Sequence, residues 1–292
     1  MLTGPTNYRR LLGADLRQMR ERRSMRIEDV AGHLGVAAST VSRIETGKAP
    51  TKTSYLKLLL DLYGVDDPAR RRDLANLARE GQRKGWWAAD EDVLMPGFGR
   101  WLGLETEAAW LRVFGAMAVP VLLRTRAYAD AVVAASRPEL SYEQRARYVA
   151  LLLRRQAVLD RAGAQESGDP FLDVVLDEAV LLRAMGPPGL MRDQLIRIAQ
   201  TANRPGVTVR VLTLAEPRAR PLVGSFMMLG FQAGEDVAST EGPRGPVIEQ
   251  RPAQVADMSG VFESLARLAM PPSDSLAMIS ELANEAVTAD RQ

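Results

Sequence analysis

The sequence predicts a mainly α-helical protein with an α/β C-terminal part, in which a five-helix domain precedes a larger α/β domain with a small mixed sheet. Three observations support this. The chain has 292 residues, more than one compact domain usually needs. Helical periodicity dominates residues 8–82, and strand-like runs alternate with helical stretches beyond residue 170. We therefore expect two domains, over residues 1–84 and 85–292.

Apolar residues at helical spacing predict the five N-terminal helices. Leu12 and Leu16 mark the buried face of the first helix, with arginines on the remaining surface. Gly64 ends the fourth helix, and Pro68 is suited to the first turn of the fifth. The last four helices are expected over residues 27–34, 37–46, 54–63 and 68–82.

A segment rich in glycine and aromatic residues, 83–103, predicts the junction between the domains. Beyond it, helices are expected over residues 104–117, 126–136, 141–161, 188–203, 252–269 and 273–288. Strands are expected over residues 171–176, 207–214, 225–231, 237–241 and, more weakly, 246–250. Strands interleaved with helices predict the small mixed sheet.

The charge of the chain is unevenly divided. Residues 1–87 hold 17 Arg and Lys against 10 Asp and Glu, a net charge of +7. The remainder holds 21 against 26, a net charge of −5, so that the total is +2. All four lysines lie in the first segment. We expect only the basic N-terminal domain to meet a polyanion.

Composition excludes several classes of site. The chain contains no cysteine, which rules out disulfides, zinc–thiolate sites and thiol nucleophiles. The N-terminus lacks the apolar core of a signal peptide, and no apolar run approaches the roughly 18 residues of a membrane span. We therefore expect a cytoplasmic protein with no membrane partner and no cofactor.

Residues 27–48 carry the most informative motif. Ala31 supplies the small side chain that two steeply crossing helices need, and Gly35 tolerates the positive φ of the turn between them. Apolar residues then lock the helix pair together. The outer face of the second helix is left with small or hydrogen-bonding side chains, which suit the floor of the DNA major groove. These base-readout candidates are Ala38, Ser39, Ser42 and Arg43.

This segment resembles the lambda-repressor/Cro-like helix-turn-helix family, also called the xenobiotic response element family. The resemblance covers residues 8–66 and rests on the pattern Leu-Gly … Ser-x-x-Ser-Arg-Ile-Glu-x-Gly. It implies that residues 37–46 form the recognition helix, with Arg43 the best candidate for contacting guanine. It also implies contacts to the DNA backbone from Arg17, Arg26, Lys48, Thr51 and Lys52.

Two positions near this motif need separate interpretation. Arg26 and Ile27 stand where family members usually place a Ser or Thr cap and then Gln, so Arg26 is expected to reach a phosphate instead. Glu45 is expected to hold the fold or to orient Arg43, because a carboxylate is repelled by DNA.

The remaining chain, 85–288, resembles the C-terminal domain of actinobacterial regulators of the WhiJ-like kind, a domain of unknown function also described as antitoxin-like. The resemblance rests on Arg-Lys-Gly-Trp-Trp, on Val-Pro-Val-Leu-Leu-Arg-Thr-Arg-Ala-Tyr-Ala and on Arg-Pro-Gly-Val-Thr-Val-Arg-Val. This chain has Val121 and Arg124 where the family commonly has Gly and Gln. The resemblance implies that the domain binds a small cognate protein or a small-molecule effector.

Aromatic residues gather near the junction and allow two interpretations. They could line a pocket for a ligand or partner, or they could hold two domains together, and we favour the second. The candidate pocket residues are Trp86, Trp87, Trp101, Trp110 and Arg124.

An enzymatic role is the weakest alternative. Asp173, Asp177 and Glu178 invite a metal or acid–base interpretation, but acids at the end of a strand followed by a helix are more often caps. No phosphate loop with its Lys-Ser/Thr and no Gly-x-Ser-x-Gly occurs. The sequence predicts no catalytic residue, no metal site and no enzyme.

The sequence as a whole therefore predicts a transcriptional regulator that binds double-stranded DNA, such as a repressor, acting as a homodimer on a pseudo-palindromic operator. One short helix reads only a few base pairs, and operator symmetry mirrors protein symmetry. Control would come from a ligand or a small partner protein. The alternative is an antitoxin-like protein that chiefly neutralises a small partner and binds DNA for autoregulation.

Overall fold

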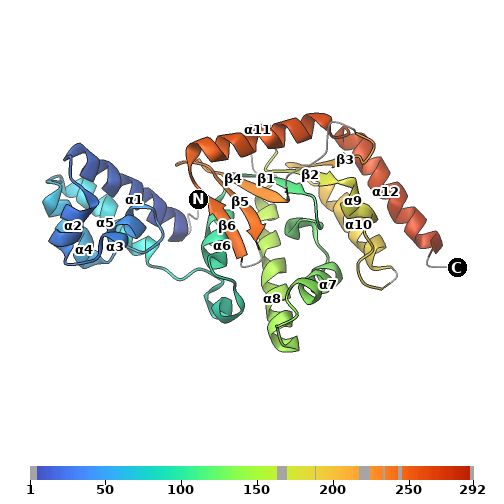
Figure 1. The fold of residues 1–292 in the computed structure, drawn as a ribbon, viewed down its shortest axis with the longest axis horizontal. Helices are drawn as coiled ribbons and strands as arrows, with labels where there is room; N and C mark the ends of the chain where they lie inside the picture. Colours follow the sequence, from blue (N-terminus) through green and yellow to red (C-terminus); the bar gives the residue numbers. More distant parts are fainter. Residues whose placement is uncertain are drawn as a thin grey trace. The chain divides into compact units, whose positions relative to one another are not determined.

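A computed structural model describes residues 5–162, 170–187, 189–216, 224–232, 234–242 and 245–289 (Figure 1). The chain divides into two compact units. The first unit runs up to residue 89 and includes residues 99–107. The second unit contains residues 90–98 and the chain from residue 108 onward. No helix in the described part of the chain has the length and apolar character needed to cross a membrane.

The first unit is built from short helices, and the five expected between residues 8 and 82 are confirmed. They are α1 (Pro5–Arg22), α2 (Ile27–Leu34), α3 (Ala38–Glu45), α4 (Thr53–Leu62) and α5 (Pro68–Gly81). Their apolar faces meet in one cluster, to which α1 contributes Leu12 and Leu16 and α3 contributes Val41 and Ile44. Asp67 caps α5 by accepting hydrogen bonds from the N–H groups of its first turn.

A sixth helix, α6 (Phe98–Glu107), contributes nearly all of its length to the first unit. The indole Nε1 of Trp86 donates to Thr106 Oγ1 at 3.1 Å. The guanidinium of Arg100 donates to the carbonyl of Thr46, just beyond α3, at 3.4 Å. Trp86 and Arg100, which lie within the glycine-rich segment 83–103, therefore form contacts inside the helical unit.

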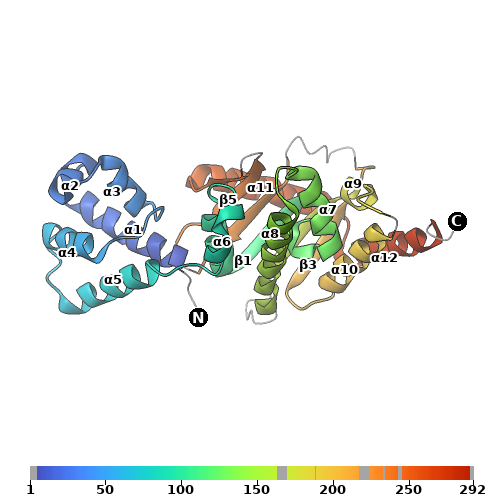
Figure 2. The ribbon, with the colours of Figure 1, turned by 90° about the horizontal axis from the view of Figure 1, so that it is seen from below.

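The helix expected over residues 104–117 is wrong. Helix α6 ends at Glu107, and Trp110–Gly115 form strand β1. This strand pairs with a neighbouring strand along each edge, and helices lie over both faces of the sheet (Figures 1 and 2). A strand covered on both faces reads as a nearly continuous apolar run, which periodicity alone cannot distinguish from a buried helix.

The second unit alternates strands and helices as expected. Its helices are α7 (Arg126–Ser136), α8 (Tyr142–Arg154), α9 (Glu178–Leu182), α10 (Leu190–Ala202), α11 (Pro252–Leu268) and α12 (Pro272–Ala289). Its other strands are β2 (Leu172–Asp177), β3 (Val207–Leu212), β4 (Phe226–Gly230), β5 (Val237–Gly242) and β6 (Gly245–Glu249). The helix expected over 141–161 ends early, because residues from Arg155 to Arg161 tighten into the 3₁₀ helix η3. Two further 3₁₀ helices are η1 (Ala88–Val93) and η2 (Val121–Leu123).

The described strands form a six-stranded mixed sheet in the order β3-β2-β1-β4-β5-β6. Strands β1, β2 and β3 are parallel, and the remaining pairs are antiparallel. Helix α11 runs along one face of the sheet, and α7 and α8 lie along the other (Figures 1 and 2). The face toward α11 buries Phe114 and Val175 against Phe262 of that helix. The small mixed sheet is thus confirmed.

The β3 edge of the sheet is closed by residues that follow α11. Met270 N donates to the carbonyl of Val211 at 2.9 Å, and Val211 N donates to Ser275 Oγ at 2.9 Å. Ser275 is fully buried. Both main-chain groups of Val211 are therefore paired on the side away from β2.

Candidate nucleic-acid interface

The turn between α2 and α3 has the geometry that the sequence predicts. Gly35 adopts φ of 65°, a left-handed conformation that disfavours any side chain. Its N–H donates to the carbonyl of Gly32 at 3.2 Å, and Val36 N donates to Ala31 at 3.0 Å. These hydrogen bonds end α2 and set the direction of α3.

The start of α2 compensates for its missing Ser or Thr cap. Arg26 is extended, and its main-chain N–H donates to Asp29 Oδ2 at 2.9 Å. Glu28 and Asp29 place negative charge in the first turn, where the helix dipole favours it. The cap is therefore only half made, and the exposed side chain of Arg26 takes no part in it.

A buried ion pair fixes α3 against α1. Glu45 accepts two hydrogen bonds from Arg20, at 2.7 Å from Nε and 2.9 Å from Nη2, and the two side chains are only 5% and 10% exposed. Arg20 also donates to the carbonyl of Met25 at 2.9 Å. Gly13 of α1 lies so close to the end of α3 that an added Cβ would stand 2.5 Å from the carbonyl oxygen of Ile44. Of the two roles expected for Glu45, the structure shows the one that holds the fold.

The outer face of α3 is open to solvent. Ser39 and Arg43 are exposed, Ala38 and Ser42 are half-buried, and Val41 lies beneath them in the core. In the described part of the chain, no carboxylate pairs with the guanidinium of Arg43. The four base-readout candidates therefore share one accessible helix face, and its only full charge is positive.

The five backbone-contact candidates differ in accessibility. Arg26, Lys48 and Lys52 are exposed. Arg17 is exposed too, although its Nε donates to Glu21 at 2.8 Å, a hydrogen bond that lowers the pKa of the Glu21 carboxyl. Thr51 is only 5% exposed, and a hydroxyl buried to this extent is a poor donor for a phosphate. Four cations thus remain available around α3.

The tryptophans expected near the junction are divided between the two units. Trp86 and Trp87 pack edge to face in the first unit, with ring centroids 5.7 Å apart. Trp101 is buried in the same unit. Trp110 belongs to β1 of the second unit, where the guanidinium of Arg112 lies 5.0 Å from its ring. None of the four lines either of the two pockets described below.

Arg124, the fifth candidate for that pocket, is buried in the second unit. Its Nε donates to the carbonyl of Val119 at 2.6 Å, and its guanidinium lies 5.9 Å from the ring of Tyr128. Burial lowers the pKa of Arg124. Gln156 donates to the carbonyls of Val121 and Arg124 at 3.0 and 2.8 Å. These contacts give Arg124 a structural role within the turn between η2 and α7.

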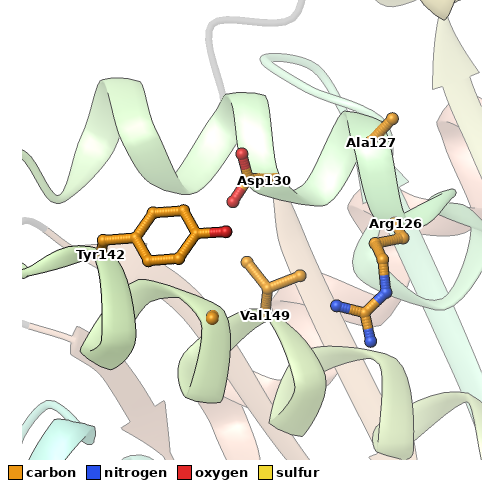
Figure 3. Close-up of a pocket in the computed structure, with 6 residues that line it drawn as sticks. Arg126, Ala127, Asp130, Tyr142 and Val149 are labelled. Carbon is orange, nitrogen blue, oxygen red and sulfur yellow. The ribbon is translucent and has the colours of Figure 1, made fainter.

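One pocket of the second unit lies between α7 and α8 and has a volume of about 460 Å³ (Figure 3). Its walls include Arg126, Asp130, Tyr142 and Val149. Tyr142 is 81% exposed, and Asp130 pairs with Arg145 at 3.1 Å. The pocket is therefore open and bordered by mixed charges.

A second pocket, of about 420 Å³, lies between the sheet and α11. Its charged side chains come from three neighbouring strands and from the helix. We call it the arginine pocket; it is lined by Arg112, Asp173, Arg210, Phe262, Glu263, Ala266 and Arg267. Sequence reasoning singled out only Asp173 of this set. The signal it missed was an Arg at an inward-facing position of both β1 and β3.

The acids considered for catalysis take separate roles. Asp177 accepts a hydrogen bond from Ala179 N at 2.9 Å and caps α9, as predicted. Asp173 pairs with Arg210 at 2.5 Å, and burial raises its pKa in spite of the two neighbouring arginines. Among the described residues, no group of three acidic or histidine side chains is placed to hold a metal ion.

Comparison with known proteins identifies two domains in the chain. Residues 11–74 match a helix-turn-helix domain. Residues 98–281 match a domain of unknown function, DUF5753. No curated protein and no solved structure matches the chain.

Proposed function

The chain belongs to the DUF5753 family and carries a helix-turn-helix domain that suggests a DNA-binding regulator, and from this premise we propose that it is a sequence-specific transcriptional regulator. The observation that supports the proposal is the outer face of α3, which is accessible to solvent, carries small side chains and is positively charged. A two-helix unit of this kind places its second helix in the major groove.

Within this proposal, the residues of α3 have distinct tasks. Ala38 and Ser39 are small enough to let the N-terminal end of the helix approach base edges closely. Arg43 reaches further and suits the two acceptors of guanine, O6 and N7. Arg17, Arg26, Lys48 and Lys52 contact phosphates and set the register, without reading sequence.

The test compares Arg43→Ala with the wild type on sites selected from genomic DNA fragments. We expect Arg43→Ala to cost about 1–3 kcal/mol and to relax preference at one base position. Arg79→Ala is the matched control, because Arg79 is a 74% exposed arginine of α5 in the same unit. Fluorescence anisotropy measures both affinities. Unchanged affinity and unchanged preference in Arg43→Ala would contradict the assignment.

We further propose that the protein acts as a homodimer and that the second unit controls DNA affinity by binding a ligand or a small protein. A ligand or partner can change DNA affinity only if it binds the DNA-competent state and the DNA-incompetent state with different affinities. The second candidate is an antitoxin-like protein whose main role is to bind a small partner protein, with DNA binding for autoregulation; it is favoured by the apolar side chains of Met117 and Leu214, which are 71% and 63% exposed. A small protein that co-purifies stoichiometrically with the full chain would favour this alternative.

We also propose that the protein acts by binding DNA and a ligand or partner, and not by catalysing a reaction. It is supported by the roles of Asp177 and Asp173 as a helix cap and an ion-pair partner. Turnover of a substrate that depends on Asp173 would contradict it.

A further inference from the structure

Charged residues occupy the same sheet face as the apolar cluster that packs against α11. Arg112 of β1 lies opposite Asp173 of β2, and Val175 lies opposite Arg210 of β3. Alternate residues of a strand share a face. Arg112, Asp173 and Arg210 therefore point to the side on which Phe114 and Val175 pack against α11. Charges on a covered face are costly unless they are paired or serve a ligand.

The ion pairs within the arginine pocket do not neutralise all of its positive charge. It contains three guanidinium groups and two carboxylates. Arg210 is paired with Asp173 at 2.5 Å, whereas Arg112 is 3.6 Å from Glu263, a long separation for an ion pair. In the described part of the chain, no carboxylate pairs with Arg267, which is exposed at the rim. A network with only a structural purpose would be expected to balance its charges.

Arg112 is held in place before any ligand arrives. Its guanidinium lies 5.0 Å from the ring centroid of Trp110 and 5.6 Å from that of Phe262. One nitrogen, Nη1, donates to Ser259 Oγ at 3.2 Å. Contacts of this kind fix the planar group and leave other N–H donors for an acceptor that presents two oxygens side by side. A carboxylate and a phosphate both present such a pair of oxygens.

We propose that the arginine pocket binds an oxyanion, the carboxylate or phosphate group of a small molecule, through Arg112, Arg210 and Arg267. A volume of about 420 Å³ admits a small organic anion rather than a macromolecule. Phe262 and Ala266 supply an apolar wall for the rest of the ligand. The inference gives the ligand control proposed above a site and a chemical class.

The experiment titrates phenyl phosphate, benzoate and inorganic phosphate into the full chain by calorimetry, without DNA and with ionic strength held constant. Because no DNA is present, failure of the probes to bind would not contradict the DNA-binding role proposed for α3. We expect saturable binding of one ion per chain for at least one probe. Phenyl phosphate and benzoate carry the same ring and separate a phosphate preference from a carboxylate preference.

Three variants test the site itself. Arg112→Gln and Arg267→Gln each remove a charged donor and should weaken binding about tenfold, which corresponds to about 1.4 kcal/mol. Arg267 is exposed, so its variant keeps the test valid if Arg112→Gln folds poorly. Arg192→Gln is the matched control, because the side chain of Arg192 on α10 is 39% exposed and does not line the pocket. Asp173→Asn should act in the opposite direction and tighten binding several-fold by removing a competing carboxylate.

A non-specific effect of net charge would weaken binding in Arg192→Gln as much as in Arg267→Gln, so unchanged binding in Arg192→Gln assigns the loss to the pocket. The proposal is overturned if none of the three probes binds saturably. It is equally overturned if binding is unchanged in Arg112→Gln, Arg267→Gln and Asp173→Asn alike.

Discussion

The outer face of α3 and the arginine pocket both present positive charge, but what surrounds that charge differs. Around α3, Arg43, Lys48 and Lys52 are exposed to water, and the buried Arg20–Glu45 ion pair lies behind the helix. In the arginine pocket, Arg112 lies between aromatic rings and Arg210 beside a buried carboxylate. Hydrated, movable cations suit a long polyanion, whose affinity comes largely from counterion release. Fixed donors suit a small ligand, whose recognition depends on geometry.

Removing the support behind α3 should give the largest effect. Glu45→Ala leaves Arg20 buried without its partner, and we expect it to destabilise the first unit by about 3–5 kcal/mol. Urea unfolding measures the loss. The matched control is Glu21→Ala, which breaks the exposed pair with Arg17 and should leave the unfolding midpoint unchanged. Equal losses in the two variants would show that burial of the Arg20–Glu45 pair is unimportant.

DNA binding through the exposed cations around α3 should weaken as the salt concentration rises. Four phosphate contacts per protomer predict that DNA affinity falls about a hundredfold between roughly 50 and 200 mM salt. Lys48→Gln should weaken binding equally for all sequences and reduce the slope of log affinity against log salt by about 1. Lys84→Gln, which removes an exposed lysine beyond α5, serves as the control. A slope that is the same in Lys48→Gln and wild type would remove Lys48 from the interface.

The smallest effect should come from pH acting on the arginine pocket. Burial raises the pKa of Asp173, so its carboxyl takes up a proton at a higher pH than an ordinary aspartate. Protonation removes the negative charge that opposes a bound anion, with Arg112, Arg210, Glu263 and Arg267 as the other charged groups facing it. The ratio of the wild-type affinity for phenyl phosphate to that of Asp173→Asn should therefore rise a few-fold as pH falls through that pKa, because protonation of the ligand affects both proteins alike. Calorimetry on both proteins at several pH values measures the ratio, and a ratio that does not change with pH would contradict the prediction.

The two regions also differ in how far the sequence predicted them. Everything that shapes the outer face of α3 lies within one short segment: the turn at Gly35, the buried Val41 and Ile44, and the exposed Arg43 between them. Local spacing therefore predicts both the fold and the face. The partner of Glu45 was not predicted, because Arg20 lies 25 residues away on another helix.

The arginine pocket depends on strands that are far apart in the chain. Arg112, Asp173 and Arg210 become neighbours only through the pairing of β1 with β2 and of β2 with β3. One of the three, β1, was predicted as part of a helix, because strands covered on both faces lack a polar alternation. If Trp110–Gly115 had been recognised as a strand, Arg112 would have been identified as a charged residue on the covered face that also holds Phe114.

The closed edge at β3 limits how copies of this protein can meet. An unpaired strand edge is a template for adding another strand, and such edges lead to aggregation unless they are covered. At Val211 the chain covers its own edge with the Met270 amide and the Ser275 hydroxyl. Met270 of the α11–α12 connection and Ser275 of α12 thus block continuation of the sheet into a neighbouring molecule at this position.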